Sequence, residues 1–491
     1  MSDVADLVKW FKTSGGSLDE EFVGFTVFPG CGRGAVALKD VPEGHVLFRI
    51  PRSILLSPEN SELPGRVGLA HWKERKMHIG WAGLILCMMW ETAQGSSSRW
   101  SGYLDSLPST FDTPMFWNDE DLRELQGTTV VAKLGRDDAE RDFTEKLLPL
   151  VQSRPDIFPV DTIYTYYTLE IYHIMGSRIL SRSFDVENDE PDEDGDADDT
   201  EEEHVAANTS VGSAMDVDGP AEAEPAADTN EPEDDLENIE EEEEPANVAM
   251  VPMADMLNAQ FGSENAKLFY EKEELRMVST KPIKAGDQIW NTYGDLPNSE
   301  LLRRYGHVDM LPLPNGDVGN PGDVVEIPAD IAVQVLGLDA GTTKERIDWW
   351  LEQGGDDVLV LESDLEIPLA LVALIRLLRL TPGEWEQAVE KDKVPKPKID
   401  GEVLPIVKTV FESRLSQYPT TLEADIAMLE NPSIAVNKKY ALVVRVGEKK
   451  ILREVIAKLG ALVEAESASQ TKKRKVRPDD DSERKSKSRR R

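Results

Sequence analysis

The sequence has little cysteine, no long apolar run and, over one long stretch, no lysine or arginine. Its 491 residues include two cysteines, Cys31 and Cys87, and no Cys/His cluster with the spacing of zinc ligands. Two thiols cannot form a disulfide framework, which fits a reducing, intracellular compartment. We expect no metal site.

Apolar segments are too short to cross a bilayer. The longest, Gly80 to Trp90, is better interpreted as a buried helix. Residues 1–12 carry charges and lack the apolar region of a signal peptide. We therefore expect no membrane association.

Lys and Arg are missing from Asp185 to Glu244, which carries 28 Asp and Glu and no Phe, Trp or Tyr. Removing these 28 charges from the formal net charge of −39 leaves −11 for the rest of the chain. Such a stretch buries too little apolar surface to offset its ordering entropy, so we predict a disordered insertion over about 185–246. A solvated loop is the simplest interpretation, and attraction of a basic substrate is the alternative.

On either side of the insertion, the pattern alternates short strands with helices. Residues 2–13 are typical of an amphipathic helix and 65–180 of a mainly helical region. Strands are expected at 24–28, 34–38, 45–50, 267–270, 275–280 and 288–292. Beyond about residue 311 the pattern predicts helices, at 369–380, 403–417, 421–430 and 436–464.

Two distant segments share one plan. Each segment has the end of one strand, then a turn that contains Pro and Gly, then a new apolar strand; the segments are Lys39 to Phe48 and Lys281 to Trp290. These two β-meanders belong either to one domain or to two. The acidic stretch between them has the character of a loop insertion, which exposed connections tolerate well.

Several short motifs can carry chemistry, although each also has an ordinary structural interpretation. Gly32-Arg33-Gly34 is either a tight turn or a loop whose bare backbone approaches a ligand. Asp255 and Asn258 either cap a helix or loop, or hold the polar ends of a ligand inside a core. Ser181-Arg182 is either part of a surface ion pair with the acidic stretch or a contact to a ligand carboxylate.

Two tyrosines complete the set. Tyr293 stands in Asn-Thr-Tyr-Gly and Tyr305 in Arg-Arg-Tyr-Gly, and both are either core tyrosines or walls of a narrow channel. Aromatic walls exclude water from an apolar stem bound between them, and a tyrosine hydroxyl can hydrogen-bond a polar group at the end of that stem.

In this order and spacing, the motifs resemble the SET-domain protein methyltransferases. The resemblance is to the branch that includes the Rubisco large-subunit lysine methyltransferase, and within it to the fungal ribosomal lysine methyltransferases. Trp100-Ser101-Gly102-Tyr103-Leu104 and Ser181-Arg182-Ser183-Phe184 are similar to connecting motifs of that branch. The resemblance covers about residues 1–465, apart from the acidic insertion.

The resemblance implies an α+β fold. A SET domain of small twisted β-sheets is expected over 1–310, with a helical insert at about 65–180 and the acidic insertion at about 185–246. An all-α substrate-binding domain is expected over 311–465, followed by a disordered basic tail over 466–491.

The resemblance also implies methyl transfer from S-adenosylmethionine to a lysine ε-amine of a protein. Tyr293 is the expected catalytic residue. The expected cofactor-binding residues are Gly32, Arg33, Gly34, Ser181, Arg182, Asn258, Ala259 and Tyr305. The expected substrate-binding residues are Asp255, Tyr270, Tyr293 and Tyr305. Ala259 stands where the family has histidine, so any contribution of that side chain is lost.

The expected partner is a basic protein. Many histone-directed SET enzymes carry a Cys-rich zinc module after the domain, and no cysteine follows Cys87 here. A non-histone substrate such as a 60S ribosomal protein is therefore expected, bound by a monomer. A catalytically silent SET-fold module that recruits basic proteins is the main alternative function, and an acidic histone-chaperone-like protein is another.

The C-terminal tail predicts where the protein is found. Lys472-Lys473-Arg474-Lys475 resembles a nuclear import signal, which predicts a nuclear location, with the cytoplasm as an additional one. Tail contacts to nucleic acid or the ribosome, or a merely solubilising tail, are the other interpretations. No other nucleic-acid binding is expected.

Overall fold

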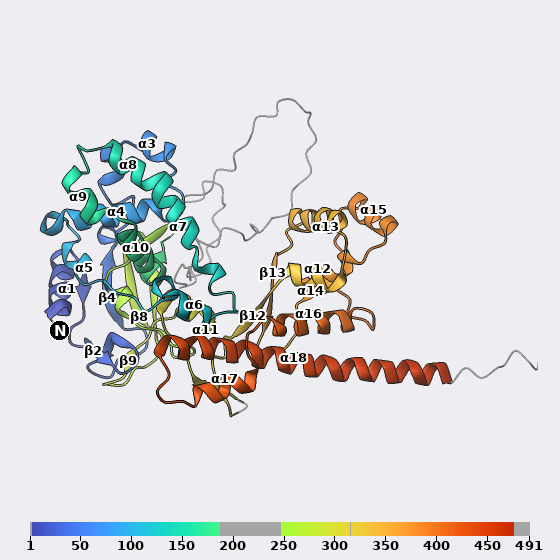
Figure 1. The fold of residues 1–491 in the computed structure, drawn as a ribbon. Coiled ribbons are helices and arrows are strands. Elements are labelled where there is room, and N and C mark those ends of the chain that lie inside the picture. The colour runs from blue at the N-terminus through green and yellow to red at the C-terminus, as the bar shows by residue number, and fades with distance from the viewer. Residues whose placement is uncertain (1, 187–246, 315, 476–491) are drawn as a thin grey trace, which may run out of the picture. The chain divides into compact units, whose positions relative to one another are not determined.

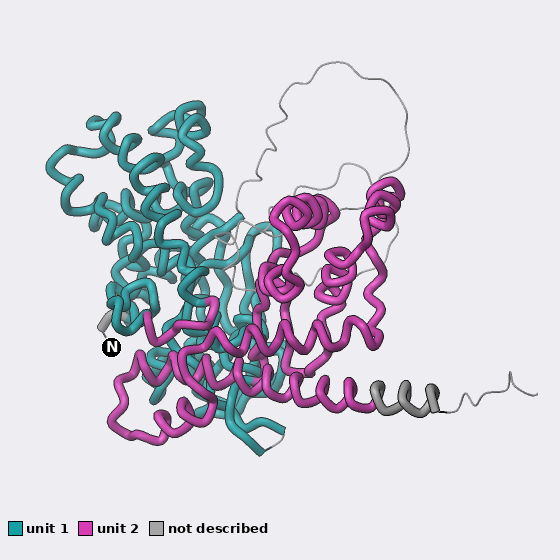
Figure 2. Tube along the Cα trace, turned by 45° about the vertical axis from the view of Figure 1, so that its right-hand side comes forward, with its two compact units in different colours: residues 1–122, 130–218, 226–320 teal, residues 123–129, 219–225, 321–491 magenta. Residues whose placement is uncertain are grey.

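The computed structural model describes residues 2–186, 247–314 and 316–475 (Figure 1). The acidic insertion from residue 187 and the tail from residue 476 lie outside the described residues. The disorder predicted for both therefore stays a prediction. The described chain divides into two compact units (Figure 2). Unit 1 comprises residues 2–122, 130–186 and 247–320, and unit 2 comprises residues 123–129 and 321–475.

Unit 1 contains small antiparallel sheets. A four-stranded sheet has the order β1-β4-β8-β7, with β1 Ser17–Leu18, β4 Val46–Pro51, β8 Glu274–Ser279 and β7 Ala266–Tyr270. A three-stranded sheet consists of β2 Val23–Phe28, β3 Gly32–Ala37 and β9 Gln288–Ile289. Two further pairs are β5 Ser183–Asp185 with β6 Val248–Met250, and β10 Leu311–Pro312 with β11 Val318–Gly319. Burial alternates along β8, so one face of its sheet is turned to the core.

The two segments with a shared plan lie side by side in unit 1. Val41 and Ile283 form an antiparallel bridge, with N–H···O distances of 2.8 and 2.9 Å in the two directions. Gly44 (φ 78°) and Gly286 (φ 91°) occupy the left-handed conformation that each turn requires. Both meanders therefore belong to one domain, and the acidic insertion lies in the connection between them.

Helices surround these sheets in unit 1. They are α1 Ser2–Thr13, α2 Leu63–Val67, α3 Leu69–Glu74, α4 Ala82–Ala93, α5 Ser101–Leu104, α6 Asp119–Arg123, α7 Arg136–Asp142, α8 Leu148–Ser153, α9 Val160–Tyr166, α10 Leu169–Arg182 and α11 Asn298–Tyr305. α4 is buried along most of its length, as its apolar sequence predicts. Within the described ranges, no helix of either unit is both long and apolar enough to span a membrane.

Unit 2 is mainly helical and has its own core. Its helices are α12 Ala329–Leu336, α13 Ala340–Glu352, α14 Leu369–Leu378, α15 Pro382–Glu390, α16 Leu404–Ser416, α17 Leu422–Leu429 and α18 Val436–Lys475. The expected helices did not include α12, α13 or α15. The helical pattern also did not predict an antiparallel pair of strands, β12 Val324–Pro328 and β13 Val358–Glu362. α18 continues beyond the predicted boundary at residue 465 to Lys475, over a sequence that has no Gly or Pro and ends in Lys and Arg, which favour helix.

Residues 123–129 belong to unit 2 although their neighbours in sequence belong to unit 1. The reason is a buried arginine in α16. Arg414 donates to the carbonyl oxygens of Glu326 and Gly127 at 2.8 and 2.6 Å. A buried guanidinium needs such acceptors, so this segment supplies part of the polar network in the core of unit 2.

Candidate active site

The Gly32-Arg33-Gly34 segment, expected to form a tight turn or a loop, is the start of strand β3, and it places bare backbone against two side-chain amides. A Cβ on Gly34 would lie 2.6 Å from Nδ2 of Asn258 and 3.2 Å from Nε2 of Gln288. Both nitrogens are buried and have no hydrogen-bond partner among the described residues. Gly32 has a φ of 73° and open space around its Cα. A residue with a side chain would not fit at position 34, because the amides of Asn258 and Gln288 lie too close to the backbone there. These two amide groups are free to donate hydrogen bonds to a ligand.

Asp255 lies in the one-turn helix Ala254–Met256, which follows Met253 in a left-handed conformation (φ 75°). Such a φ is rare for a residue with a side chain and is often found at functional sites. The Asp255 side chain is 2% exposed, and its Oδ2 accepts a hydrogen bond of 3.0 Å from the hydroxyl of Tyr103. Its Oδ1 is buried and has no partner among the described residues.

Arg182, at the end of α10, is joined to Asp255. Its Nη1 donates to the Asp255 backbone oxygen at 2.7 Å and lies 3.8 Å from Oδ2. Burial raises the pKa of the Asp255 carboxyl, and the charge of Arg182 opposes that rise. The Nε of Arg182 is buried without a partner in the described chain. The pair thus offers a ligand one acceptor and one donor.

Two other predicted residues have their polar groups engaged within the protein. Ser181 donates its hydroxyl to the Ser177 carbonyl of the same helix at 2.7 Å. Arg33 donates to the Ser106 carbonyl at 2.8 Å. Ser181 is therefore committed to α10, whereas the charge of Arg33 still acts on Asp255 and lowers its pKa.

Tyr293 and Tyr305 stack face to face. Their ring centroids lie 4.2 Å apart, with an angle of 6° between the ring planes. The Tyr293 hydroxyl donates to the Leu257 carbonyl at 3.3 Å. Burial raises the pKa of Tyr293 to about 12, with opposing effects from Arg182, which lowers it, and Asp255, which raises it. The two tyrosines, Asp255 and Arg182 are therefore parts of one site.

The segment at the position of the family histidine is held by its backbone. Ala259 forms a parallel bridge with Asn291, and the Asn291 N–H donates to the Asn258 carbonyl at 2.9 Å. These contacts do not depend on the side chain of residue 259. They join Asn258 to the segment that follows β9 and contains Tyr293.

A cavity of about 250 Å³ opens beside this segment in unit 1. Its walls include Ala259, Phe261, Thr292, Tyr293 and Leu301. Tyr270, the remaining predicted residue, ends β7 in the four-stranded sheet, pairs with Leu275 and packs against the core. None of the contacts described above ties Tyr270 to the tyrosine pair.

A buried ion cluster supports Tyr305 from within α11. Glu300 accepts hydrogen bonds from Arg303 Nη2 at 2.8 Å and Arg304 Nε at 2.6 Å. Burial alone would raise the pKa of Glu300, but Arg303 and Arg304 lower it to about 2. The helix that carries Tyr305 is thus stabilised by one carboxylate shared between two arginines.

This cluster predicts an acid-sensitive stability. Because the folded-state pKa is depressed from 4.5 to about 2, Glu300 stabilises the fold above pH 4.5, and this contribution is lost as pH falls towards 2. We expect Glu300→Gln to lower the free energy of unfolding by about 3 kcal/mol near neutral pH, and by progressively less in acid. Urea unfolding at several pH values measures this.

Glu62→Gln is the matched control, since Glu62 forms an exposed i,i+4 pair with Arg66 and its side chain is 73% exposed. It should change stability by less than about 1 kcal/mol at every pH. A loss in Glu300→Gln that does not vary with pH would show that charge is not the cause.

Sequence patterns missed three members of the site: Tyr103, Ser106 and Gln288. Tyr103 is fully buried and bonded to Asp255, 152 residues away in sequence. A signal for it existed, because Tyr103 stands in the connecting motif that begins at Trp100. Gln288 and Ser106 had none, since a polar residue in a strand or turn is ordinarily solvent-facing.

Two family models match the chain. The model described as SET domain matches residues 32–294, more than half of the 491 residues. The model described as Rubisco LSMT substrate-binding matches residues 338–452. The first match contains the site from Gly32 to Tyr293, and the second lies within unit 2.

Individual relatives match over much of the chain. The human N-lysine methyltransferase SETD6 is 27% identical over 463 residues, covering 87% of this chain and 84% of that protein. Ribosomal lysine N-methyltransferase 4 of Saccharomyces cerevisiae is 31% identical over 320 residues, covering 65% of this chain and 56% of that protein.

Solved structures share the fold. The SET domain of LSMT bound to lysine and AdoHcy has a TM-score of 0.65 at 18% identity, covering 94% of this chain and 91% of that one. Rubisco LSMT bound to AdoMet gives 0.62 at 19% identity, covering 94% and 92%. At this identity the likeness concerns the fold alone, and it confirms the α+β class expected from the sequence.

Proposed function

Because the chain belongs to the SET-domain family, we propose that it is a protein-lysine methyltransferase that uses S-adenosylmethionine. One observation carries the proposal: the stacked Tyr293–Tyr305 pair is close enough to Asp255 and Arg182 for their charges to shift the pKa of Tyr293. An aromatic surface next to polar groups that lack partners suits a reaction between a lysine amine and a charged donor.

The polar atoms near Gly34 and Asp255 fit S-adenosylmethionine. Its methionine part has an ammonium, which needs an acceptor, and Asp255 Oδ1 can serve as one although Asp255 was expected to bind the substrate. Its carboxylate needs a donor such as Arg182 Nε. The amides of Asn258 and Gln288 add two donors, and Gly34 leaves the space between them open. When bound, the cofactor supplies an electrophilic methyl group on a positively charged sulfur.

Tyr293 and Tyr305 bind and orient the lysine side chain in this proposal. Their buried rings exclude water, which disfavours the ammonium form of lysine and leaves the amine lone pair available. With a pKa of about 12, Tyr293 stays a neutral phenol near pH 7. Its hydroxyl can therefore hydrogen-bond the neutral amine, and alignment supplies most of the rate enhancement.

The substrate we propose is a basic, non-histone protein, with a 60S ribosomal protein as the leading candidate. Similarity to a ribosomal lysine methyltransferase supports this, as does the net charge of −39, which favours association with a basic partner. Similarity of residues 338–452 to a substrate-binding model suggests that unit 2 takes part in recognition. We also propose that the protein acts as a monomer. A nuclear location is proposed on the basis of the import-like sequence from Lys472.

Radiolabelled transfer tests the proposal. The full chain is incubated with tritiated S-adenosylmethionine and either 60S ribosomal proteins or an equal mass of core histones. We expect label on lysine of one or a few ribosomal proteins, and at least about tenfold less on histones. The reverse preference would contradict the substrate assignment. Cofactor binding with no transfer to any basic protein would favour the silent binding module.

A further inference from the structure

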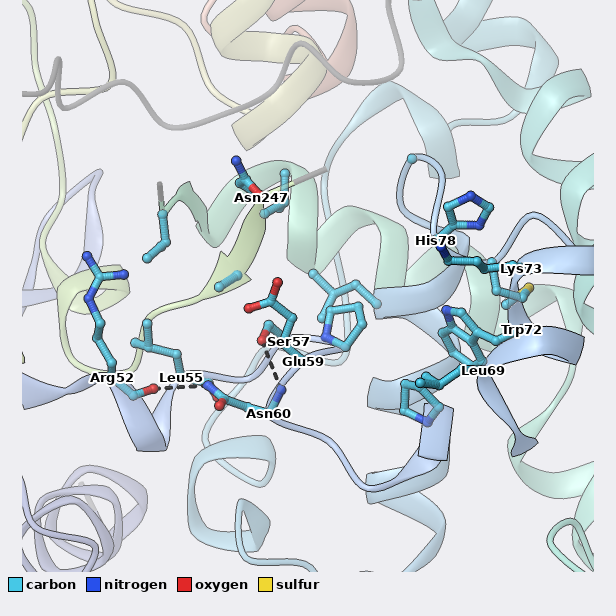
Figure 3. Close-up of a pocket in the computed structure, with 18 residues that line it drawn as sticks. Arg52, Leu55, Ser57, Glu59, Asn60, Leu69, Trp72, Lys73, His78 and Asn247 are labelled. Atoms are coloured by element: carbon cyan, nitrogen blue, oxygen red, sulfur yellow. Dashed lines mark hydrogen bonds between the residues drawn. The ribbon is translucent and has the colours of Figure 1, made fainter. Parts of the chain in front are cut away.

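A second cavity, of about 370 Å³, lies in unit 1 and shares no lining residue with the cavity beside Tyr293 (Figure 3). Most of its lining is apolar: Leu55, Pro58, Pro64, Leu69, Trp72, Met77, Leu84, Val186, Val248 and Ala249. Leu69 is 66% exposed, although it lines a concave surface. A cavity of this size and lining accepts a few apolar side chains, and the proposed methyl transfer does not use it.

Residues 187–246 begin and end at this cavity. Val186 and Asn247 both line it, and the Val186 N–H donates to the Asn247 carbonyl at 2.9 Å. The pairing of β5 with β6 continues this contact into the sheet. The two ends of the 60-residue acidic segment are thus held together at the cavity.

Residues 72–78, which we call the basic wall, contribute Trp72, Lys73, Met77 and His78 to another part of the same cavity. The stretch carries three cations: Lys73, which lines the cavity, and Arg75 and Lys76, which are its neighbours in sequence but do not line it. Figure 3 shows Lys73 and His78 beside Trp72 and Leu69, apart from Arg52 and Leu55. The one carboxylate of the wall, Glu74, contacts His71 at 3.0 Å. Within the part of the chain that the structure describes, the three cations form no ion pair.

The acidic segment contains a short sequence that complements this cavity. Leu236 and Ile239 are its only Leu and its only Ile, and they lie within Asp234-Asp235-Leu236-Glu237-Asn238-Ile239-Glu240. Leu236 is 11 residues before Asn247. A fully extended chain of this length reaches roughly 36 Å. The tether therefore lets both aliphatic side chains reach any part of the cavity.

We propose that Asp234–Glu240 docks in this cavity. Leu236 and Ile239 cover the apolar lining around Leu69 and Trp72, and the flanking carboxylates face the basic wall. A tether of this length gives an effective concentration of about millimolar, so a weak intrinsic affinity is enough for occupancy. The carboxylates are screened by salt, so docking weakens as ionic strength rises.

Disulfide trapping in the full-length chain tests the docking without any assay of methyl transfer. In a Cys31→Ser background, Ser57→Cys places a thiol in the cavity lining, and Asn238→Cys places one between Leu236 and Ile239. Cys87 is buried and is retained. The rate of intramolecular disulfide formation in a glutathione buffer is measured by mass spectrometry, in dilute protein at 0.05 and 0.5 M NaCl.

Two controls keep the tether constant or nearly so. Gly195→Cys replaces Asn238→Cys, since Gly195 is nine residues after Val186, as Asn238 is nine before Asn247. Leu236→Ser with Ile239→Ser keeps both thiols and removes the apolar side chains. We expect the Ser57–Asn238 pair to form at least about tenfold faster than either control at low salt, and high salt to reduce this advantage. Equal rates in all three chains, or disulfides mainly between molecules, would overturn the proposal.

Discussion

Replacing Tyr293 with phenylalanine should lower the rate of methyl transfer by at least about 100-fold. The substitution keeps the ring that stacks on Tyr305 and removes the hydroxyl that contacts the Leu257 carbonyl at 3.3 Å. The buried surface is retained, so affinity for S-adenosylmethionine should change by less than about threefold. Single-turnover transfer with saturating cofactor measures the rate, and equilibrium binding measures the affinity.

Tyr164→Phe is the control for this substitution, because Tyr164 is 85% exposed. It should leave both the rate and the affinity unchanged. If Tyr293→Phe transfers methyl groups at the wild-type rate, the hydroxyl has no part in the reaction and the proposed role of Tyr293 is wrong.

Replacing Gly34 with alanine should weaken binding of S-adenosylmethionine by about 10- to 100-fold. The new methyl group would lie 2.6 Å from Nδ2 of Asn258 and 3.2 Å from both Nε2 of Gln288 and a ring carbon of Phe28. It is crowded on three sides, so the two amides must move away from the positions in which they face a ligand. Equilibrium dialysis with tritiated cofactor gives the dissociation constant.

Gly65→Ala is the matched control, since a Cβ on Gly65 in α2 meets no atom within 4 Å. It should leave cofactor affinity unchanged and stabilise the protein slightly, by up to about 1 kcal/mol. Unaltered affinity in Gly34→Ala would place the cofactor away from β3.

The sequence predicted the elements of this site better than their contacts. Strand periodicity located β2, β3, β4, β7 and β8 to within one or two residues, and apolar composition identified α4 as buried. These features depend on local pattern, which a single sequence contains. The strand expected over 288–292 is shorter than predicted, because β9 ends at Ile289, where pairing passes to the irregular bridge between Asn291 and Ala259.

The partners of the site residues could not be predicted in the same way. Tyr103 and Asp255 meet across 152 residues, and nothing in the local pattern of either one specifies the other. The stacking of Tyr293 on Tyr305 likewise depends on how α11 returns to the strand exit. The pattern did indicate that Arg182 had a polar partner, but the acidic stretch that follows it offered many alternatives to Asp255.

In the proposed function, the segments containing Gly34, Asp255 and Tyr293 enclose one cofactor site. A crystal structure of the full chain grown with S-adenosylhomocysteine tests it most directly. We predict the ligand in contact with Asp255 and Asn258, on the side of β3 where Gly34 leaves space. Well-ordered ligand elsewhere, for example in the cavity lined by Leu55 and Trp72, would contradict the account.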